Sequence, residues 1–270
     1  MATDIGQIKA FFTDSDWYLQ KRRYNIAIRA ETVQEFLKTN HFDSILDIGC
    51  GDGSLSLPLL NSGRRLTLLD ISSKMLSIAQ SRVPTKLQKN VETVNDEFMR
   101  AKLEKNSYDL VICVGVLAFV QSLDDFISRI TSLLKPTGAV IMENTDASHF
   151  YTSMVRFYHG LRSAFVPDRC PTNTYSREAV LQHFRKRGFV LSGFYRYTLA
   201  FPLLQRMLSQ EQLYKVIRRH YGTAERNRNA WMGNECLYCF QRSAAPTTKG
   251  SLPRATLTGS LNERRLDDGR

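Results

Sequence analysis

The sequence has few cysteines and no long apolar run. Its five cysteines, an odd number, are scattered over 270 residues, which argues against a disulfide framework. No apolar stretch approaches the roughly 18 to 20 residues that span a bilayer. The first residues also lack the basic start and apolar core of a secretory signal. We therefore expect a soluble protein of the cytoplasm.

Metal-ligand patterns are also scarce. No cluster of His, Asp and Glu has the spacing of a metal site. Cys236 and Cys239 have the spacing of a metal-binding pair, but the run 235–241 is typical of a strand. Side chains three apart on a strand point to opposite faces, so these residues are predicted to be two packed thiols. We expect no metal.

Acidic residues are outnumbered. Lys and Arg total 37 against 26 for Asp and Glu, which gives a net charge of +11. A basic protein suits an acidic partner such as nucleic acid or a membrane surface, although charge says nothing about fold. Much of the excess lies in the segment 206–228, where Tyr214 and Tyr221 are interleaved with basic residues. Contact with nucleic acid through this segment, or of the apolar run Phe201–Leu208 with a membrane, stays open.

The chain has enough apolar residues for one sizeable core, because 43% of them are hydrophobic. Residues 1–43 predict a helical cap. From residue 44 short apolar strands alternate with amphipathic helices, which favours an α/β, doubly wound, mostly parallel sheet. The expected strands are 44–48, 65–70, 91–94, 108–114, 139–143, 189–199 and 235–241. The expected helices within this region include 54–62, 74–82, 123–134 and 177–187.

Two insertions interrupt the predicted domain 44–242. The first, at about 145–174, is rich in aromatic and polar residues, and the second, at about 201–233, carries the basic segment. Connections of this length in a compact domain are typical of lids or binding segments. The tail 243–270 has almost no large apolar residue and is predicted to be disordered.

The predicted strand 44–48 runs directly into a glycine-rich turn, Gly49-Cys-Gly-Asp-Gly53. Glycines allow a ligand to approach the backbone, and open parallel sheets bind ligands at the carboxyl ends of their strands. Asp70 ends the next predicted strand, where it can accept both hydroxyls of a ribose. Asp96 follows the third strand, where it can accept from an adenine amino group. The alternative is a plain turn in a domain that binds nothing.

The kind of nucleotide is limited by two residues. A dinucleotide fingerprint requires a glycine where this chain has Ser54. Asp47, at the end of the strand, is unfavourable beside a pyrophosphate and favourable beside a cationic amino group.

Four stretches resemble the ordered motifs of class I S-adenosylmethionine-dependent methyltransferases, and most closely the small-molecule branch that includes ubiquinone- and menaquinone-biosynthesis methyltransferases. They are Leu46-Asp-Ile-Gly-Cys-Gly-Asp-Gly53, Leu68-Leu-Asp-Ile-Ser-Ser-Lys-Met-Leu76, Ser107-Tyr-Asp-Leu-Val111 and Leu133-Leu-Lys-Pro-Thr-Gly-Ala-Val140. The resemblance implies S-adenosylmethionine as cofactor and a seven-stranded sheet. It also implies that the last strand, 235–241, runs antiparallel beside 189–199.

The resemblance also implies roles for matching positions. The methionine moiety would be held by Asp47 and the backbone of Gly49, Cys50 and Gly51, and the ribose by Asp70. The adenine edge would be held by Asp96 and Glu97, and Val114 would line the wall near the sulfonium. Ile71 is a further candidate for contact with the cofactor. Phe119 stands where many relatives carry histidine, so no role of that histidine transfers.

Methyl transfer from a sulfonium is an in-line displacement that needs alignment and exclusion of water more than a nucleophile. If the acceptor carries a proton, His149 and Glu143 are the candidate general bases. Tyr18 and Tyr24 are candidates to cover the cofactor as part of an aromatic lid. The acceptor is expected to be a small molecule, with an oxygen, nitrogen or carbon as the methylated atom. Methylation of RNA or protein through 206–228, and a non-catalytic scaffold of the same fold, are the alternatives.

Overall fold

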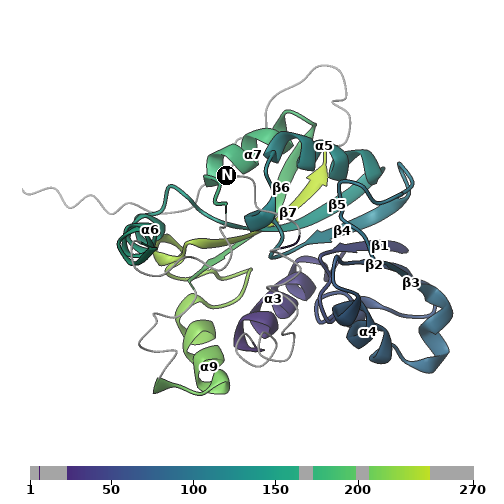
Figure 1. Ribbon diagram of the computed structural model, residues 1–270, viewed down its shortest axis with the longest axis horizontal. Helices are drawn as coiled ribbons and strands as arrows, with labels where there is room; N and C mark the ends of the chain where they lie inside the picture. The colour runs from purple at the N-terminus through teal and green to yellow at the C-terminus, as the bar shows by residue number, and fades with distance from the viewer. Residues whose placement is uncertain (1–5, 7–22, 164–172, 199–206, 244–270) are drawn as a thin grey trace, which may run out of the picture.

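A seven-stranded sheet runs through the centre of the chain (Figure 1). The computed structural model describes residues 6, 23–163, 173–198 and 207–243. The strand order is β3-β2-β1-β4-β5-β7-β6. The strands are β1 (Ser44–Ile48), β2 (Arg65–Leu69), β3 (Val91–Val94), β4 (Tyr108–Cys113), β5 (Leu134–Thr145), β6 (Phe189–Tyr197) and β7 (Glu235–Arg242). Strands β1 to β5 pair in parallel, whereas β7 is antiparallel to both β5 and β6. The predicted doubly wound sheet with an antiparallel last strand is confirmed.

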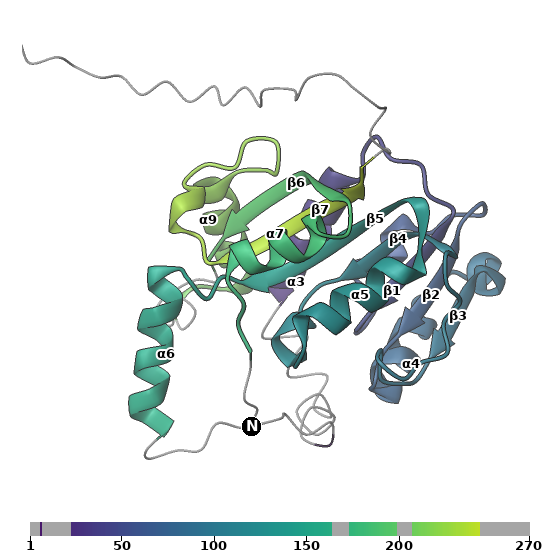
Figure 2. The same cartoon turned by 90° about the horizontal axis from the view of Figure 1, so that it is seen from above.

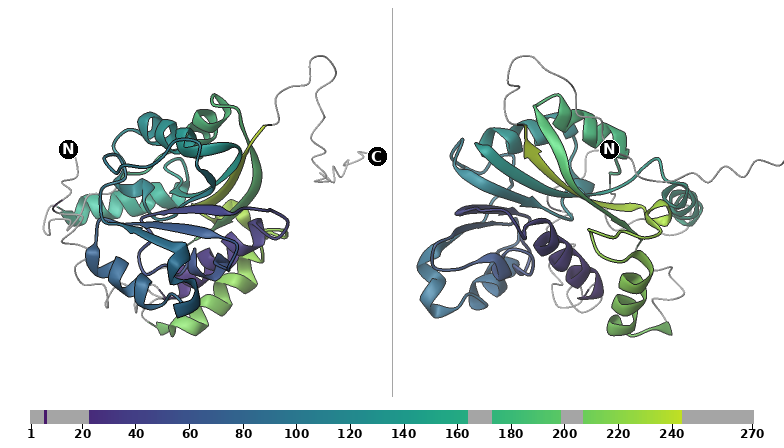
Figure 3. Two further views of the ribbon diagram at one scale, coloured as in Figure 1. Left: turned by 90° about the vertical axis from the view of Figure 1, so that its right-hand side faces the viewer. Right: turned by 180° about the vertical axis from the view of Figure 1, so that it is seen from behind.

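Helices cover both faces of the sheet (Figures 1 and 3). The helices α3 (Arg23–Phe36), α4 (Ser73–Ser81) and α9 (Gln210–Tyr221) pack on one face, and α5 (Leu123–Leu133) and α7 (Arg177–Arg185) pack on the other. The sixth, α6 (Phe150–Ser163), extends away from the sheet beyond the end of β5 (Figure 2). The described residues also form the 3₁₀ turns η1 (Leu57–Leu59), η2 (Thr85–Asn90), η3 (Leu117–Phe119) and η4 (Ala230–Met232).

One expected helix and the start of one expected strand were wrong. The expected helix 54–62 is a series of turns that contains only η1, because Pro58 lacks an N–H and disfavours helical geometry at the residue before it. The expected strand 139–143 is part of a longer strand that follows α5 directly. Leu134 already pairs with Tyr108, so β5 continues through Pro136 and Gly138.

The two thiols of the C-terminal strand point in opposite directions, as predicted. Cys236 packs in the core on the α5 and α7 face, and Cys239 packs on the α3 and α4 face. Within the described part of the chain, no group of three His, Cys, Asp or Glu residues is placed to hold a metal ion. No described helix is long and apolar enough to cross a membrane.

Parts of the predicted cap, insertions and tail lie outside the described residues. These parts are 1–5, 7–22, 164–172, 199–206 and 244–270. Of the cap, α3 is described and is helical, and the insertions contribute α6, α9 and η4.

A buried ion pair attaches α3 to the sheet. Arg29 on α3 donates from Nε to Glu143 Oε1 of β5 at 2.7 Å, and its Nη2 contacts Glu143 Oε2. The Tyr197 hydroxyl of β6 lies 3.1 Å from Glu143 Oε1 and 2.6 Å from Asn25 Oδ1. The side chains of Arg29 and Glu143 are only 12% and 3% exposed, so this carboxylate depends on its partners in place of water.

We expect Arg29→Met to lower the free energy of unfolding by about 3 to 5 kcal/mol, because it leaves the Glu143 charge buried without its partner. The double variant Arg29→Met/Glu143→Gln should recover most of this loss. Urea unfolding followed by circular dichroism measures both. The matched control is Lys38→Met, whose partner Glu225 is exposed; it should cost nothing measurable. Equal losses for Arg29→Met and Lys38→Met would contradict the assignment.

Candidate functional site

A cavity of about 500 Å³ lies at the carboxyl ends of β1, β2 and β4. Its walls come from the segments that follow these strands and β3, and from the start of α5. The lining residues are Ile48, Gly49, Gly51, 69–71, Met75, 97–100, 114–116, 119–122, Asp125 and Phe126. Open parallel sheets form ligand sites at this edge, where neighbouring connections leave for opposite faces.

Glycine is required in the turn after β1 for two reasons. Gly49 and Gly51 have φ angles of 66° and 54°, in the left-handed region that side chains disfavour. A Cβ at Gly49 would also lie 2.4 Å from Val116 Cγ2, in the segment after β4. The two strand ends therefore touch through a residue that must lack a side chain. A Cβ at Gly51 would meet nothing within 4 Å.

Asp70 joins two of the turns that surround the cavity. Its Oδ2 accepts a hydrogen bond from the Gly51 N–H at 2.9 Å, and its Oδ1 accepts from the Ser72 N–H at 2.8 Å. Burial raises the pKa of Asp70, and these backbone donors oppose the rise. Each carboxylate oxygen keeps capacity for a further donor from the cavity side.

Asp47 lies in β1, ahead of the glycine turn, and does not line the cavity. It is 2% exposed, and its Oδ2 accepts from the Ser56 hydroxyl at 2.5 Å. Burial raises the pKa of Asp47 from 3.8 to about 7. The charges of Asp70 and Asp52 also raise this pKa, and the hydrogen bond from Ser56 lowers it. Because the unfolded chain releases this proton near pH 4, the stability that the neutral form supports is lost as the pH rises from about 4 to about 7.

Asp96 and Glu97 follow β3, and only one of them reaches the cavity. Asp96 is exposed and accepts from the Glu97 N–H at 2.7 Å. Glu97 lines the cavity, and its buried Oε2 has no hydrogen bond from any residue that the structure describes, although Arg100 Nε lies 3.1 Å away in an ion pair. Of the two carboxylates, Glu97 is the one placed to meet a donor inside the cavity.

The remaining cofactor candidates divide into two groups. Ile71 and Val114 line the cavity. Cys50 is buried with its thiol 3.6 Å from the Gly51 carbonyl oxygen, and Tyr24 is buried against β6 and α9; neither lines the cavity. Tyr18 lies outside the described residues.

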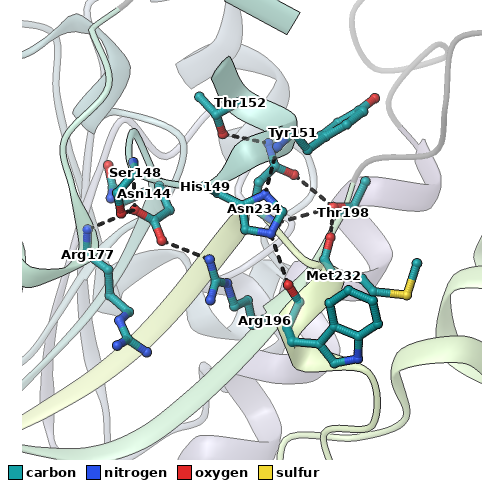
Figure 4. Close-up of polar contacts among 12 residues, drawn as sticks. Asn144, Ser148, His149, Tyr151, Thr152, Arg177, Arg196, Thr198, Met232 and Asn234 are labelled. Atoms are coloured by element: carbon teal, nitrogen blue, oxygen red, sulfur yellow. Dashed lines mark hydrogen bonds and ion pairs between the residues drawn. The ribbon is translucent and has the colours of Figure 1, made fainter. Parts of the chain in front are cut away.

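The two candidate bases lie outside the cavity lining and have structural partners, which Figure 4 shows for His149. Glu143 is paired with Arg29. His149 precedes α6, where its Nδ1 accepts from the Tyr151 N–H at 3.2 Å and its Nε2 lies 3.0 Å from the Trp231 carbonyl oxygen. These two contacts need the neutral imidazole with its proton on Nε2. Either residue would have to give up its contacts to act as a base.

Several apolar side chains that line the cavity were not predicted from the sequence. Besides Ile71 and Val114, which were predicted, the apolar lining includes Met75, Phe98, Met99, Phe119 and Phe126. Their types do not distinguish them from core residues. The useful indication was their position in the chain, because Phe98 and Met99 follow the end of β3, and Phe119 follows the end of β4.

Part of the basic segment 206–228 is neutralised within the chain. Arg218 pairs with Glu35 and Glu31 on α3, and Lys215 pairs with Glu211 at 2.6 Å. These pairs reduce the charge available to a phosphate backbone.

Comparison with known proteins agrees with this architecture. Residues 45–138 match a family model described as a methyltransferase domain. Among curated proteins, the chain is 30% identical over 142 residues to the ubiquinone biosynthesis O-methyltransferase of Rickettsia prowazekii, covering 48% of this chain and 54% of that protein. It is 28% identical over 113 residues to the malonyl-[acyl-carrier protein] O-methyltransferase of Halalkalibacterium halodurans, covering 40% and 41%. The chain spans about half the length of the curated relatives it matches.

Solved structures extend the likeness of fold over most of the chain. A structure from Thermotoga maritima, described as a methyltransferase and possible histamine N-methyltransferase, matches with a TM-score of 0.62 at 17% identity, covering 88% of this chain and 99% of that one. The magnesium protoporphyrin IX methyltransferase of Synechocystis matches with a TM-score of 0.58 at 16% identity, covering 87% and 98%. Residues 45–138 therefore match a methyltransferase domain, and the motifs and fold of the chain are similar to those of class I S-adenosylmethionine-dependent methyltransferases.

Proposed function

We propose that this chain is an enzyme that transfers the methyl group of S-adenosylmethionine to a small molecule. The observation that carries the proposal is the cavity in which the glycine turn and Asp70 meet, at the carboxyl ends of β1 and β2. Its volume of about 500 Å³ is within the range of roughly 300 to 1,000 Å³ typical of small-molecule sites.

The polar groups around the cavity suit the parts of this cofactor. The two oxygens of Asp70, each with one backbone donor, have room for the two ribose hydroxyls. Glu97 Oε2 lacks a hydrogen bond and suits the amino group of adenine. The apolar side chains of Ile71 and Phe119 are suited to the faces of the purine ring. Asp47, behind Gly49, would attract the cationic methionine end.

The chemistry needs little from the protein beyond placement. The bound cofactor supplies an electrophilic methyl group on a sulfonium. The carboxylates that line the cavity are Asp70, Glu97 and Asp125, and the first two are assigned here to holding the adenosine. Because His149 and Glu143 have structural partners, we propose that alignment and exclusion of water supply most of the catalysis.

Small-molecule acceptors are favoured by the names of the relatives, two of which are O-methyltransferases. We propose an oxygen as the methylated atom on this basis. RNA or protein methylation is less favoured, because Arg218 and Lys215 are already paired with carboxylates. A non-catalytic scaffold is less favoured because the glycine turn and Asp70 form the bonded arrangement that a cofactor would use.

Binding of S-adenosylhomocysteine tests the cofactor assignment. We expect Asp70→Ala to weaken binding by roughly 100-fold or more, because two hydrogen bonds to a charged group are worth about 1.5 to 3 kcal/mol each. Glu97→Gln should weaken it by roughly tenfold, whereas the neighbouring Asp96→Asn should leave it unchanged. Isothermal titration calorimetry measures these affinities, with NADH as the competing class of nucleotide.

Failure of the folded wild-type protein to bind either S-adenosylmethionine or S-adenosylhomocysteine would overturn the proposal. Equal losses for Asp96→Asn and Glu97→Gln would instead reject the assignment of Glu97. Once binding is established, transfer of labelled methyl groups to a panel of hydroxylated small molecules, with Asp70→Ala as the inactive control, tests the acceptor class.

The affinity for S-adenosylmethionine should depend on pH through Asp47. Its pKa of about 7 means that it is mostly neutral at pH 6 and mostly ionised at pH 7.5, and only the ionised form attracts the methionine ammonium. Affinity should therefore rise over this interval and fall above about pH 8, where an α-amino group loses its proton. Titrations in buffers of different ionisation enthalpy should show proton release near pH 6.5. Asp47→Asn should bind more weakly and lose the rise; a rise that persists in this variant would assign it to another group.

A further inference from the structure

One wall of the cavity is formed by the short turn after β4. This turn contains η3, and Val116, Phe119 and Val120 from it line the cavity. A single 3₁₀ turn without a side-chain cap has little intrinsic stability. Val116 must also stay in contact with Gly49, so a small displacement of the turn would change the shape of the site.

A segment distant in sequence holds this turn from outside. We define the strap as residues 173–177, which lead into α7 and include its first residue. The Asn173 N–H donates to the Ala118 carbonyl oxygen at 2.6 Å, and Asn173 Nδ2 donates to the Val120 carbonyl oxygen at 2.7 Å. The Tyr175 hydroxyl also donates to Val120 O, at 2.5 Å. The same hydroxyl lies 3.3 Å from the Gln121 carbonyl oxygen. Two residues of the strap thus contact three carbonyl groups of the turn, those of residues 118, 120 and 121.

The other side of the strap is fixed to the end of β5. The Tyr175 carbonyl oxygen accepts from Asn144 Nδ2 at 2.8 Å, and the Arg177 N–H donates to Asp146 Oδ1 at 3.1 Å. Asp146 is 3% exposed and also pairs with Arg196 of β6 at 2.8 Å (Figure 4). The strap is therefore anchored to a buried and ionically paired residue.

The same anchor holds the beginning of the first insertion. Asp146 Oδ1 accepts from both the N–H and the hydroxyl of Ser148, at 3.1 and 2.6 Å. His149 follows and caps α6 through the Tyr151 N–H. A continuous series of hydrogen bonds thus connects the cavity wall, through the strap, to the start of α6.

We propose that Asn173 and Tyr175 are positioning residues for the cofactor: they hold the wall formed by Val116, Phe119 and Val120 in place and so determine how tightly the adenosine part is bound. The inference rests on the proposed function, because it takes the cavity to be the cofactor site. Neither residue lines the cavity, and both act through the backbone of the turn.

Two variants remove the side-chain contacts with little disturbance. Tyr175→Phe removes one hydroxyl, and Asn173→Ala removes the amide that donates to Val120. We expect each to raise the Kd for S-adenosylhomocysteine and for adenosine by the same factor, roughly three- to tenfold, as expected for one lost hydrogen bond. The double variant should lose more than either single variant.

The matched control is Asn90→Ala. Asn90 also bridges two loop carbonyls, those of Ser62 and Arg64 at 3.2 and 2.9 Å, but it does not line or support the cavity. We expect Asn90→Ala to lower the Tm about as much as Asn173→Ala does, and to leave the affinity for S-adenosylhomocysteine unchanged. An equal loss of affinity in Asn90→Ala and Asn173→Ala would show that the effect is one of general stability and would overturn the proposal.

A second measurement does not depend on any ligand. The amides of Phe119 and Val120 donate to Val116 O and Leu117 O within the turn, so their hydrogen exchange reports its opening. Exchange over 117–121 should be faster in the double variant than in the wild type or Asn90→Ala. Unchanged exchange would overturn the proposal even if affinity fell. If the wild-type protein binds no S-adenosylhomocysteine, the proposed function fails, while exchange still decides whether the strap holds the turn.

Discussion

The pairing of β1 with β4 is the constraint on which the site depends. These neighbours are not consecutive in sequence, and the chain leaves them toward opposite faces of the sheet. The divergence opens a crevice at their carboxyl ends, and the close approach of Gly49 to Val116 sets its floor. A larger residue at position 49 would separate the two turns from which the cavity is built.

Carboxylates near this edge of the sheet have two different surroundings. Glu143 and Asp146, at the end of β5, are buried and paired with Arg29 and Arg196. Asp47 and Asp70, beside the cavity, are buried with no cationic partner among the described residues, and burial raises their pKa values. The carboxylates that are paired with arginine connect elements of the fold to one another. The carboxylates that lack such a pair favour the binding of a cationic ligand. Perturbed groups of this second kind concentrate at functional sites.

The parts of the structure that were predicted from sequence depend on local pattern. The pattern that predicts each feature is contained within a few residues. This holds for the glycine turn, for Asp70 at the end of its strand, and for each single strand or helix of the alternation. The parts that were missed depend on distant partners. Nothing near Glu143 in the sequence indicates that Arg29, 114 positions earlier, neutralises it. The helix expected at 54–62 failed for a local reason, since Pro58 outweighed an apolar pattern. Phe119 and Met99, which line the cavity, are of residue types that are common in a hydrophobic core. Only the fold distinguishes them from core residues.

The position of β7 has a consequence for biosynthesis. This strand lies between β5 and β6, both of which precede it in the chain, and pairs with each along most of its length. While the protein emerges from the ribosome, β5 and β6 therefore have no partner on their facing edges until residue 242 has been translated. Two open strand edges of this kind can pair with other chains, so the nascent protein is most exposed to aggregation just before its last strand is added. A chain that terminates before β7 would keep both edges open permanently.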